Sequence, residues 1–133
     1  MIKIVIDASG AVLGRLASYA AKQAIFGKEV IVVNCDNVIV SGTRNLIINE
    51  YKQIRMKGGT SLKGPHFPKN PERIVKRTIR NMIPYKKGKG LDAFKRVMCY
   101  NEVPSEYQNA EKISMPKILK INTMTLREIS KVI

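Results

Sequence analysis

The sequence predicts an α/β domain that begins with a βαβ unit and has a long basic excursion leaving its core. The length of 133 residues, 44% of them hydrophobic and 26% charged, is typical of one globular domain. Short β-branched runs alternate with helical periodicity from the N-terminus, the pattern of a βαβ unit. We therefore expect one domain over 1–133, with a βαβ-type core at 1–56, a basic excursion at 57–96, and a return strand with a C-terminal extension at 97–133.

The first elements form the predicted βαβ unit. Ile2 to Ile6 is a short β-branched run ended by Asp7, which predicts a buried strand. A helix follows, with Ser9 as its expected N-cap and Gly27 after its end. Val30 to Asn34 is the second predicted strand. The helix is indicated by apolar residues at three- and four-residue spacing: Val12, Leu13, Leu16, Ala17, Ala20, Ala21 and Ala24.

The next elements are a strand and two helices. Val38 to Val40 predicts a strand, and 43–56 predicts a helix. Asn70-Pro71-Glu72 is a strong helix start, and Pro84 stops that helix. The expected apolar face of the first helix is Leu46, Ile47, Tyr51 and Ile54. The expected apolar stripe of the second is Ile74, Val75, Thr78, Ile79, Met82 and Ile83.

The remaining elements are shorter. Tyr85 to Gly90 reads as a turn, and Leu91 and Phe94 mark a short helix that leads into a strand at Val97 to Tyr100. Beyond Pro104 we expect an excursion and a return that ends in a helix with Leu126 and Ile129 on one face.

The charge is concentrated in one segment. Lys and Arg number 24 against 10 acids, a net charge of +14. Residues 52–96 hold fourteen basic residues against only Glu72 and Asp92, whereas the segments on either side carry +1 each. Like charge without acids opposes compaction unless a counter-charge is bound, so we expect a nucleic-acid partner. Lysines outnumber arginines 16 to 8, which suits phosphate contacts more than base reading.

Several other classes of function lack their residues. Cys35 and Cys99 have no CxxC partner and His66 is the only histidine, so we expect no metal, no cofactor and no catalytic residues. Gly10 and Gly14 do not form a GxGxxG motif, and we expect no small-molecule substrate. The N-terminal apolar run is too short for a signal peptide, and no run is long enough to span a bilayer, which predicts a cytoplasmic protein without a membrane partner.

Two groups of motifs carry a family resemblance. The first is Leu13-Gly14-Arg15-Leu16-Ala17-Ser18, and the second is Arg77-Thr78-Ile79-Arg80-Asn81-Met82-Ile83-Pro84, with Gly64-Pro65 between them and Val103-Pro104 after them. This pattern resembles the universal large-subunit ribosomal protein thirteen family, in its archaeal and eukaryotic form, as far as about Pro104. Asn81 stands where the family pattern has a glycine. The resemblance implies a three-layer α/β/α domain with a small, mostly parallel sheet and basic loop and helix excursions. It also implies a structural protein of the cytoplasmic ribosome whose partners are large-subunit rRNA and neighbouring large-subunit proteins.

The candidate RNA-binding residues come from two arguments. The resemblance implies Arg15, Arg73, Arg77 and Arg80, and the charge and composition of the middle segment add Lys57, Lys63, His66, Lys69, Lys76, Lys86, Lys87 and Lys89. Tyr85 and Phe67 are expected to pack in the core, with stacking on bases as the alternative. Two other functions stay open: a small phosphate- or nucleotide-handling enzyme that uses the helix terminus at Ser9, and a generic nucleic-acid-binding protein.

Overall fold

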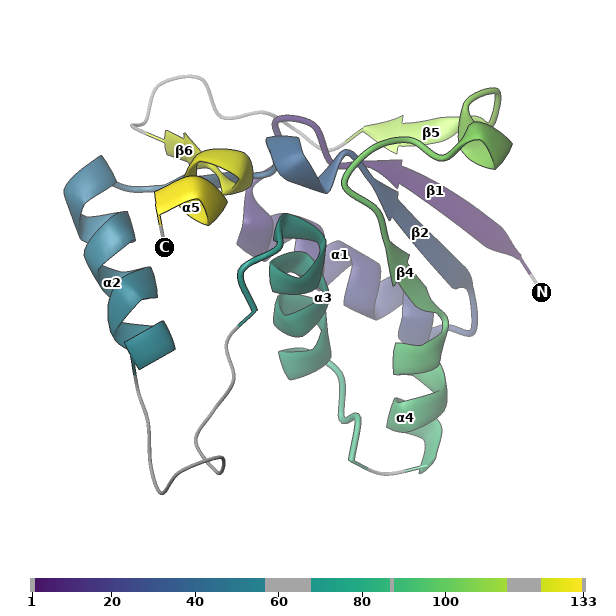
Figure 1. Ribbon diagram of the computed structural model, residues 1–133. Coiled ribbons are helices and arrows are strands. Elements are labelled where there is room, and N and C mark those ends of the chain that lie inside the picture. Colours follow the sequence, from purple (N-terminus) through teal and green to yellow (C-terminus); the bar gives the residue numbers. More distant parts are fainter. Residues whose placement is uncertain (1, 57–67, 87, 115–122, 133) are drawn as a thin grey trace.

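The computed structural model describes residues 2–56, 68–86, 88–114 and 123–132 (Figure 1). Its helices are α1 (Leu13–Ile25), α2 (Arg44–Met56), α3 (Pro71–Asn81), α4 (Gly88–Lys95) and α5 (Leu126–Val132), with 3-10 turns η1 (Cys35–Asn37) and η2 (Ser105–Tyr107). Its strands are β1 (Lys3–Asp7), β2 (Glu29–Val33), β3 (Ile39–Ser41), β4 (Val97–Cys99), β5 (Lys112–Ser114) and β6 (Thr123–Thr125).

The main sheet has four strands in the order β4-β2-β1-β5, and every described pairing in it is parallel. Lys3 lies opposite Glu29 and Asp7 opposite Val33, so β1 and β2 are in register along their whole length. The connection between them is α1, which confirms the predicted βαβ unit. The α/β class and the mostly parallel sheet are also confirmed.

The two faces of the sheet are covered differently. Side chains such as Ile6, Val30 and Val32 form the main core together with buried residues of α1, α3 and α4. The ribbon in Figure 1 shows these helices beside the sheet. Alternate residues point the other way, because side-chain direction has a period of two along a strand. There Val5, Ile31 and Val33 pack against the chain around Tyr100 and Tyr107. Among the described residues, the chain that covers this second face is coil with the turn η2, whereas the expected α/β/α arrangement placed helices there.

A second, smaller sheet lies beside the first. β3 pairs antiparallel with β6, and Leu126 N–H donates to the Val38 carbonyl where α5 begins. The predicted strand at 38–40 is therefore real, but it does not join the main sheet. The sequence did not predict strands at β5 and β6. The structure confirms the predicted terminal helix, in which Leu126 and Ile129 are fully buried.

The N-terminus of α1 differs from its prediction. Ser9 is not the N-cap: the helix begins at Leu13 after Val12, without a capping side chain. The Asp7 carboxylate accepts the Ser9 N–H at 3.0 Å and the Asn34 amide at 3.0 Å. Asp7 therefore closes a turn between the strand and the helix, and this turn moves the helix start four residues beyond Ser9.

Two predicted core residues are exposed instead. Leu46 is 68% exposed because α2 packs mainly on α5 and β6 and has only a narrow buried face. Met82 is 43% exposed because it lies just after the end of α3. The short helix marked by Leu91 and Phe94 is confirmed as α4, but it already begins at Gly88, within the predicted turn, and it buries Gly90 and Ala93 while Leu91 is 42% exposed. No helix in the described ranges is long and apolar enough to cross a bilayer.

Candidate nucleic-acid interface

Helix α3 directs cationic side chains outward because its apolar side packs on the core. Ile74, Val75 and Ile79 are buried against α1 and the sheet. Positions 73, 76, 77 and 80 follow the three- and four-residue spacing of one helical face. The residues at those positions are Arg73, Lys76, Arg77 and Arg80. Burial of the apolar stripe thus fixes four cationic side chains on the outward surface.

The start of α3 is held by a distant residue. Asn70 occupies the N-cap position and Pro71 the first turn, as the sequence predicted, but the Asn70 side chain makes no capping bond. The Glu72 N–H instead donates to Asn101 Oδ1 at 3.0 Å. The position of α3 is therefore coupled to the segment that leaves β4.

The cations of α3 surround a surface hollow. It has a volume of about 230 Å³ and is lined by Pro68, Arg73, Lys76, Arg77, Arg80 and Phe94. None of these lining residues is acidic, so the hollow has a positive potential. Its size and charge suit a phosphate group of a polyanion.

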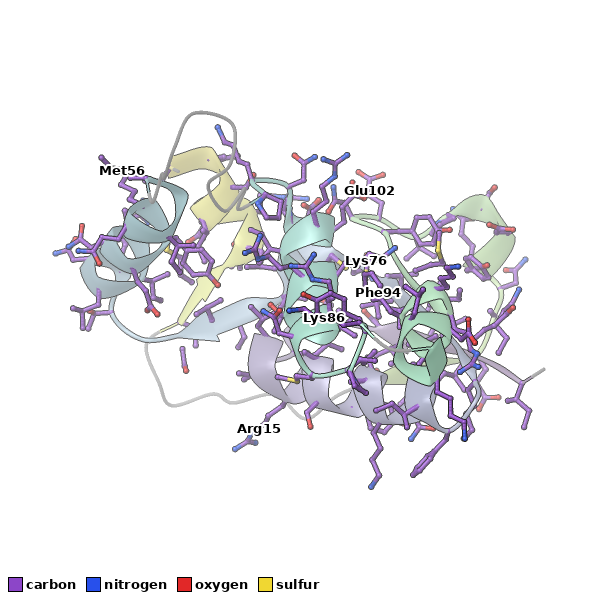
Figure 2. The ribbon with its side chains drawn as sticks, turned by 90° about the horizontal axis from the view of Figure 1, so that it is seen from below. Arg15, Met56, Lys76, Lys86, Phe94 and Glu102 are labelled. Carbon is purple, nitrogen blue, oxygen red and sulfur yellow. The ribbon has the colours of Figure 1, made fainter. Side chains whose placement is uncertain are left out.

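Aromatic rings hold several of these cations in place. Lys76 Nζ lies 5.3 Å from the centre of the Phe94 ring, and the Arg80 guanidinium lies 5.0 Å from the centre of the Tyr85 ring. Lys86 Nζ is 6.0 Å from the same Tyr85 ring, and the two rings are 6.5 Å apart. Figure 2 shows Lys76, Lys86 and Phe94 together beside α3. Cation–π contacts of this kind restrict long side chains and so preorganise the charged surface.

Arg80 also has an unused donor. Its Nε atom is buried and makes no hydrogen bond with any described residue. A buried N–H without an acceptor is costly, and an anionic oxygen is its strongest partner. The arginine therefore favours a bound anion at the edge of the hollow.

The structure brings together some, but not all, of the predicted site residues. Arg73, Lys76, Arg77 and Arg80 line one hollow, and Lys86 joins them through Tyr85. Lys69 and Lys89 are exposed; the first directly precedes the N-cap of α3, and the second lies in the first turn of α4. Arg15 is exposed on α1 and points away from the hollow (Figure 2). Four predicted residues lie outside the described ranges: Lys57, Lys63, His66 and Lys87.

Sequence reasoning missed two features of this surface. Phe94 was expected only as a helix marker, and its contact with Lys76 depends on the packing of α4 against α3. Arg96 counted toward the basic charge, but its Nη1 donates to the Ala24 carbonyl at 2.8 Å, which satisfies the C-terminal end of α1. The sequence holds one signal for the contact between Lys76 and Phe94: aromatic residues occur within an acid-poor segment.

The fold and this surface define a small basic α/β protein whose functional face suits a polyanion. Within the described residues there is no group of three or more His, Cys, Asp or Glu side chains that could hold a metal ion. The family model of ribosomal protein L13 matches residues 2–106. This chain belongs to the ribosomal protein L13 family, and it is a ribosomal protein rather than an enzyme.

Individual relatives agree with the family model. The large ribosomal subunit protein uL13 of Methanosarcina barkeri is 47% identical over 112 residues, 84% of this chain and 79% of that protein. The protein of the same name from Methanocaldococcus jannaschii is 46% identical over 133 aligned residues, 96% of this chain and 94% of the relative. The one from Picrophilus torridus is 41% identical and covers 98% of this chain and 96% of the relative. These relatives are archaeal, in agreement with the form of the family that the motifs resemble.

Proposed function

We propose that this chain is a structural constituent of the large ribosomal subunit that binds and stabilises folded large-subunit rRNA through the cationic face of α3. The observation that carries the proposal is the hollow lined by Arg73, Lys76, Arg77 and Arg80, with the unused Nε donor of Arg80 at its edge. Its site of action is then the cytoplasmic ribosome, with neighbouring subunit proteins around it.

Binding follows from charge and shape. Each phosphate that a Lys or Arg neutralises releases condensed counterions, which supplies most of the affinity. Arginines donate in a planar fork that matches phosphate oxygens, and the aromatic contacts of Lys76 and Arg80 reduce the entropy lost on binding. Selectivity comes from the shape of folded RNA, because A-form helices do not expose base edges in a readable major groove.

The enzyme alternative has no structural support. It depends on Ser9 at a helix terminus, but α1 begins at Leu13 and the Ser9 N–H already donates to Asp7. Generic nucleic-acid binding is the remaining alternative, since phosphate contacts alone do not distinguish DNA from RNA. Competition between structured large-subunit rRNA and duplex DNA separates the two, and equal competition would favour the generic function.

The salt dependence of rRNA binding tests the proposed face. A variant with Arg73→Gln, Lys76→Gln and Arg80→Gln loses three cations from the hollow. Its slope of log K against log salt should flatten by roughly 0.7–0.9 for each lost phosphate contact. The matched control is Lys3→Gln, Lys28→Gln and Lys131→Gln, which removes the same charge from other elements and should change the slope less. Equal slopes in the two variants would exclude the α3 face as the RNA surface.

A further inference from the structure

A second surface of the protein carries the opposite charge. The chain has a net charge of +14, yet residues 98–111 contain no Lys or Arg and three acids, Glu102, Glu106 and Glu111. Burial raises the pKa of Tyr100 in this segment, and the neighbouring Tyr107 and Glu106 raise it further. The segment is therefore a region of negative potential on an otherwise basic protein.

The part of this segment that carries Glu106 and Glu111 lies on the far side of the sheet from the cations of α3, whereas its first residues reach the N-terminus of α3, where Asn101 Oδ1 accepts the Glu72 N–H. Tyr100, Val103 and Tyr107 pack on the sheet face formed by Val5, Ile31 and Val33. Helix α3 packs on the other face, through Ile74 and Ile79. If the α3 face contacts RNA, the acidic segment faces away from that RNA, and its carboxylates would repel any other phosphate backbone.

The same side of the molecule has an apolar hollow. Its volume is about 570 Å³, and it lies beside β1 and β5, lined by Lys3, Ile4, Val5, Tyr107, Ala110, Glu111 and Ile113. Ile113 stays exposed at its edge. A hollow with apolar walls and a carboxylate at its rim suits an apolar side chain that is flanked by basic ones.

Lys3, which lines this hollow, and Lys112, which lies between the lining residues Glu111 and Ile113 in the sequence, already have partners. Lys3 Nζ lies 3.8 Å from a Glu29 carboxylate oxygen and 5.7 Å from the centre of the Tyr107 ring. Lys112 Nζ donates to the carbonyls of Gln108 and Ala110 at 3.0 and 3.2 Å. Neither forms a described ion pair with Glu106 or Glu111, so these carboxylates keep their charge available to an incoming cation.

We infer that the surface formed by residues 100–113 docks a basic, extended segment of another large-subunit protein, with an apolar side chain in the hollow and Lys or Arg side chains against Glu106 and Glu111. The argument is charge complementarity: an acidic, apolar-walled surface on a basic protein fits a basic peptide and excludes RNA. The inference rests on the proposed function only in placing the partner in the large subunit.

Site-specific photo-crosslinking in assembled large subunits tests the surface. One variant carries p-benzoylphenylalanine in place of Gln108, an exposed residue of the acidic segment. The other carries it in place of Asn81, an exposed residue four positions after Arg77 and so on the cationic side of α3. After irradiation, the adduct at 108 should survive ribonuclease and contain a large-subunit peptide in which Lys and Arg exceed the acids. The adduct at 81 should contain rRNA.

The outcomes separate the two proposals. An rRNA adduct at 108, an adduct within the same chain or with a second copy, a linked peptide without excess basic residues, or no adduct at all would each overturn the docking surface. Absence of an rRNA adduct at 81 would instead count against the proposed function, whatever happens at 108.

A charge test uses the same readout. With Glu106→Gln and Glu111→Gln added, the protein adduct at 108 should decrease several-fold, because the carboxylates no longer attract the partner. The matched control, Glu50→Gln and Glu128→Gln, removes two exposed acids from α2 and α5 and should leave the yield unchanged. Equal yields in the two variants would overturn the assignment of a basic partner.

Discussion

Asn101 caps α3 from a distant part of the chain: its Oδ1 accepts the N–H of Glu72, 29 residues earlier in the sequence, at 3.0 Å. Glu72 lies in the first turn of α3, where backbone N–H groups lack intrahelical partners. The bond ties the helix that carries the cationic face to the segment that leads into the acidic surface. The Asn101 side chain thus links the position of the cationic face of α3 to that of the acidic surface.

Replacement of Asn101 with alanine should therefore destabilise the fold. We expect the free energy of unfolding to decrease by about 0.5–2 kcal/mol, the usual cost of losing a capping side chain. The measurement is urea denaturation followed by circular dichroism. Asn109→Ala, at an exposed position in the same segment, is the control and should change the free energy of unfolding little. A larger loss in the Asn109 variant would refute the cap.

The sequence could predict the elements whose signals are local. The buried faces of α1 and α3 follow from apolar spacing, and the structure confirms most of their residues. The Asn101 cap could not be predicted because its partner is distant in the chain. β5 and β6 have three residues each, too few to show a period of two. Leu46 was misplaced because periodicity marks an apolar face without revealing which neighbours cover it.

The candidate interface was predictable in composition but not in detail. An acid-poor segment with four cations on one helical face is visible in the sequence. The contacts of Lys76 with Phe94 and of Arg80 with Tyr85 were not, because they depend on how α3, the following turn and α4 pack. The hydrogen bond from Arg96 to the Ala24 carbonyl could not be predicted for the same reason, because the two residues are distant in the sequence.

The two faces of α3 should respond differently to truncation. Ile79 is fully buried, so Ile79→Ala should reduce the free energy of unfolding by roughly 2–5 kcal/mol. Arg80→Ala removes a cation–π contact with Tyr85, worth about 0.5–2 kcal/mol at a partly buried site, and should mainly weaken rRNA binding. Thermal melting and rRNA titration of both variants check this. The reverse ranking in stability would mean that the helix faces are assigned incorrectly.

The two cysteines should differ in reactivity. Cys35 is fully buried, and a hydrogen bond with Cys99 together with burial raises the pKa of its thiol. Cys99 is only half-buried. Because the thiolate is the reactive form, iodoacetamide at pH 8 should modify Cys99 first. Peptide mass mapping over time measures both rates, and faster labelling of Cys35 would contradict the structure.

The raised pKa of Cys35 also gives the stability a pH dependence. The folded-state pKa lies above the unfolded value of about 8.5, so the stabilisation is complete below that pH and is lost as the pH rises. Between about pH 9 and 10 this group should remove on the order of 1 kcal/mol of unfolding free energy per pH unit. Urea denaturation across this range measures the slope. Cys35→Ala should flatten it relative to the native chain, and an unchanged slope would contradict the assignment.

Two glycines in helices should respond in opposite directions to the same substitution. A Cβ atom at Gly90 would collide with the Pro84 backbone carbonyl, which is not a group that moves easily, whereas a Cβ at Gly14 meets no described atom within 4 Å. Gly14→Ala should therefore stabilise the fold by about 0.5–1 kcal/mol, because alanine loses less conformational entropy in a helix. Gly90→Ala should destabilise it by roughly 1–3 kcal/mol through overpacking.

Because Gly90 fixes how closely α4 approaches the turn after α3, Gly90→Ala should also displace Phe94 from Lys76 and weaken rRNA binding, whereas Gly14→Ala should leave binding unchanged. Thermal melts and rRNA titrations of the two variants give both readouts, and equal effects would show that the close approach at Gly90 does not position the cationic surface.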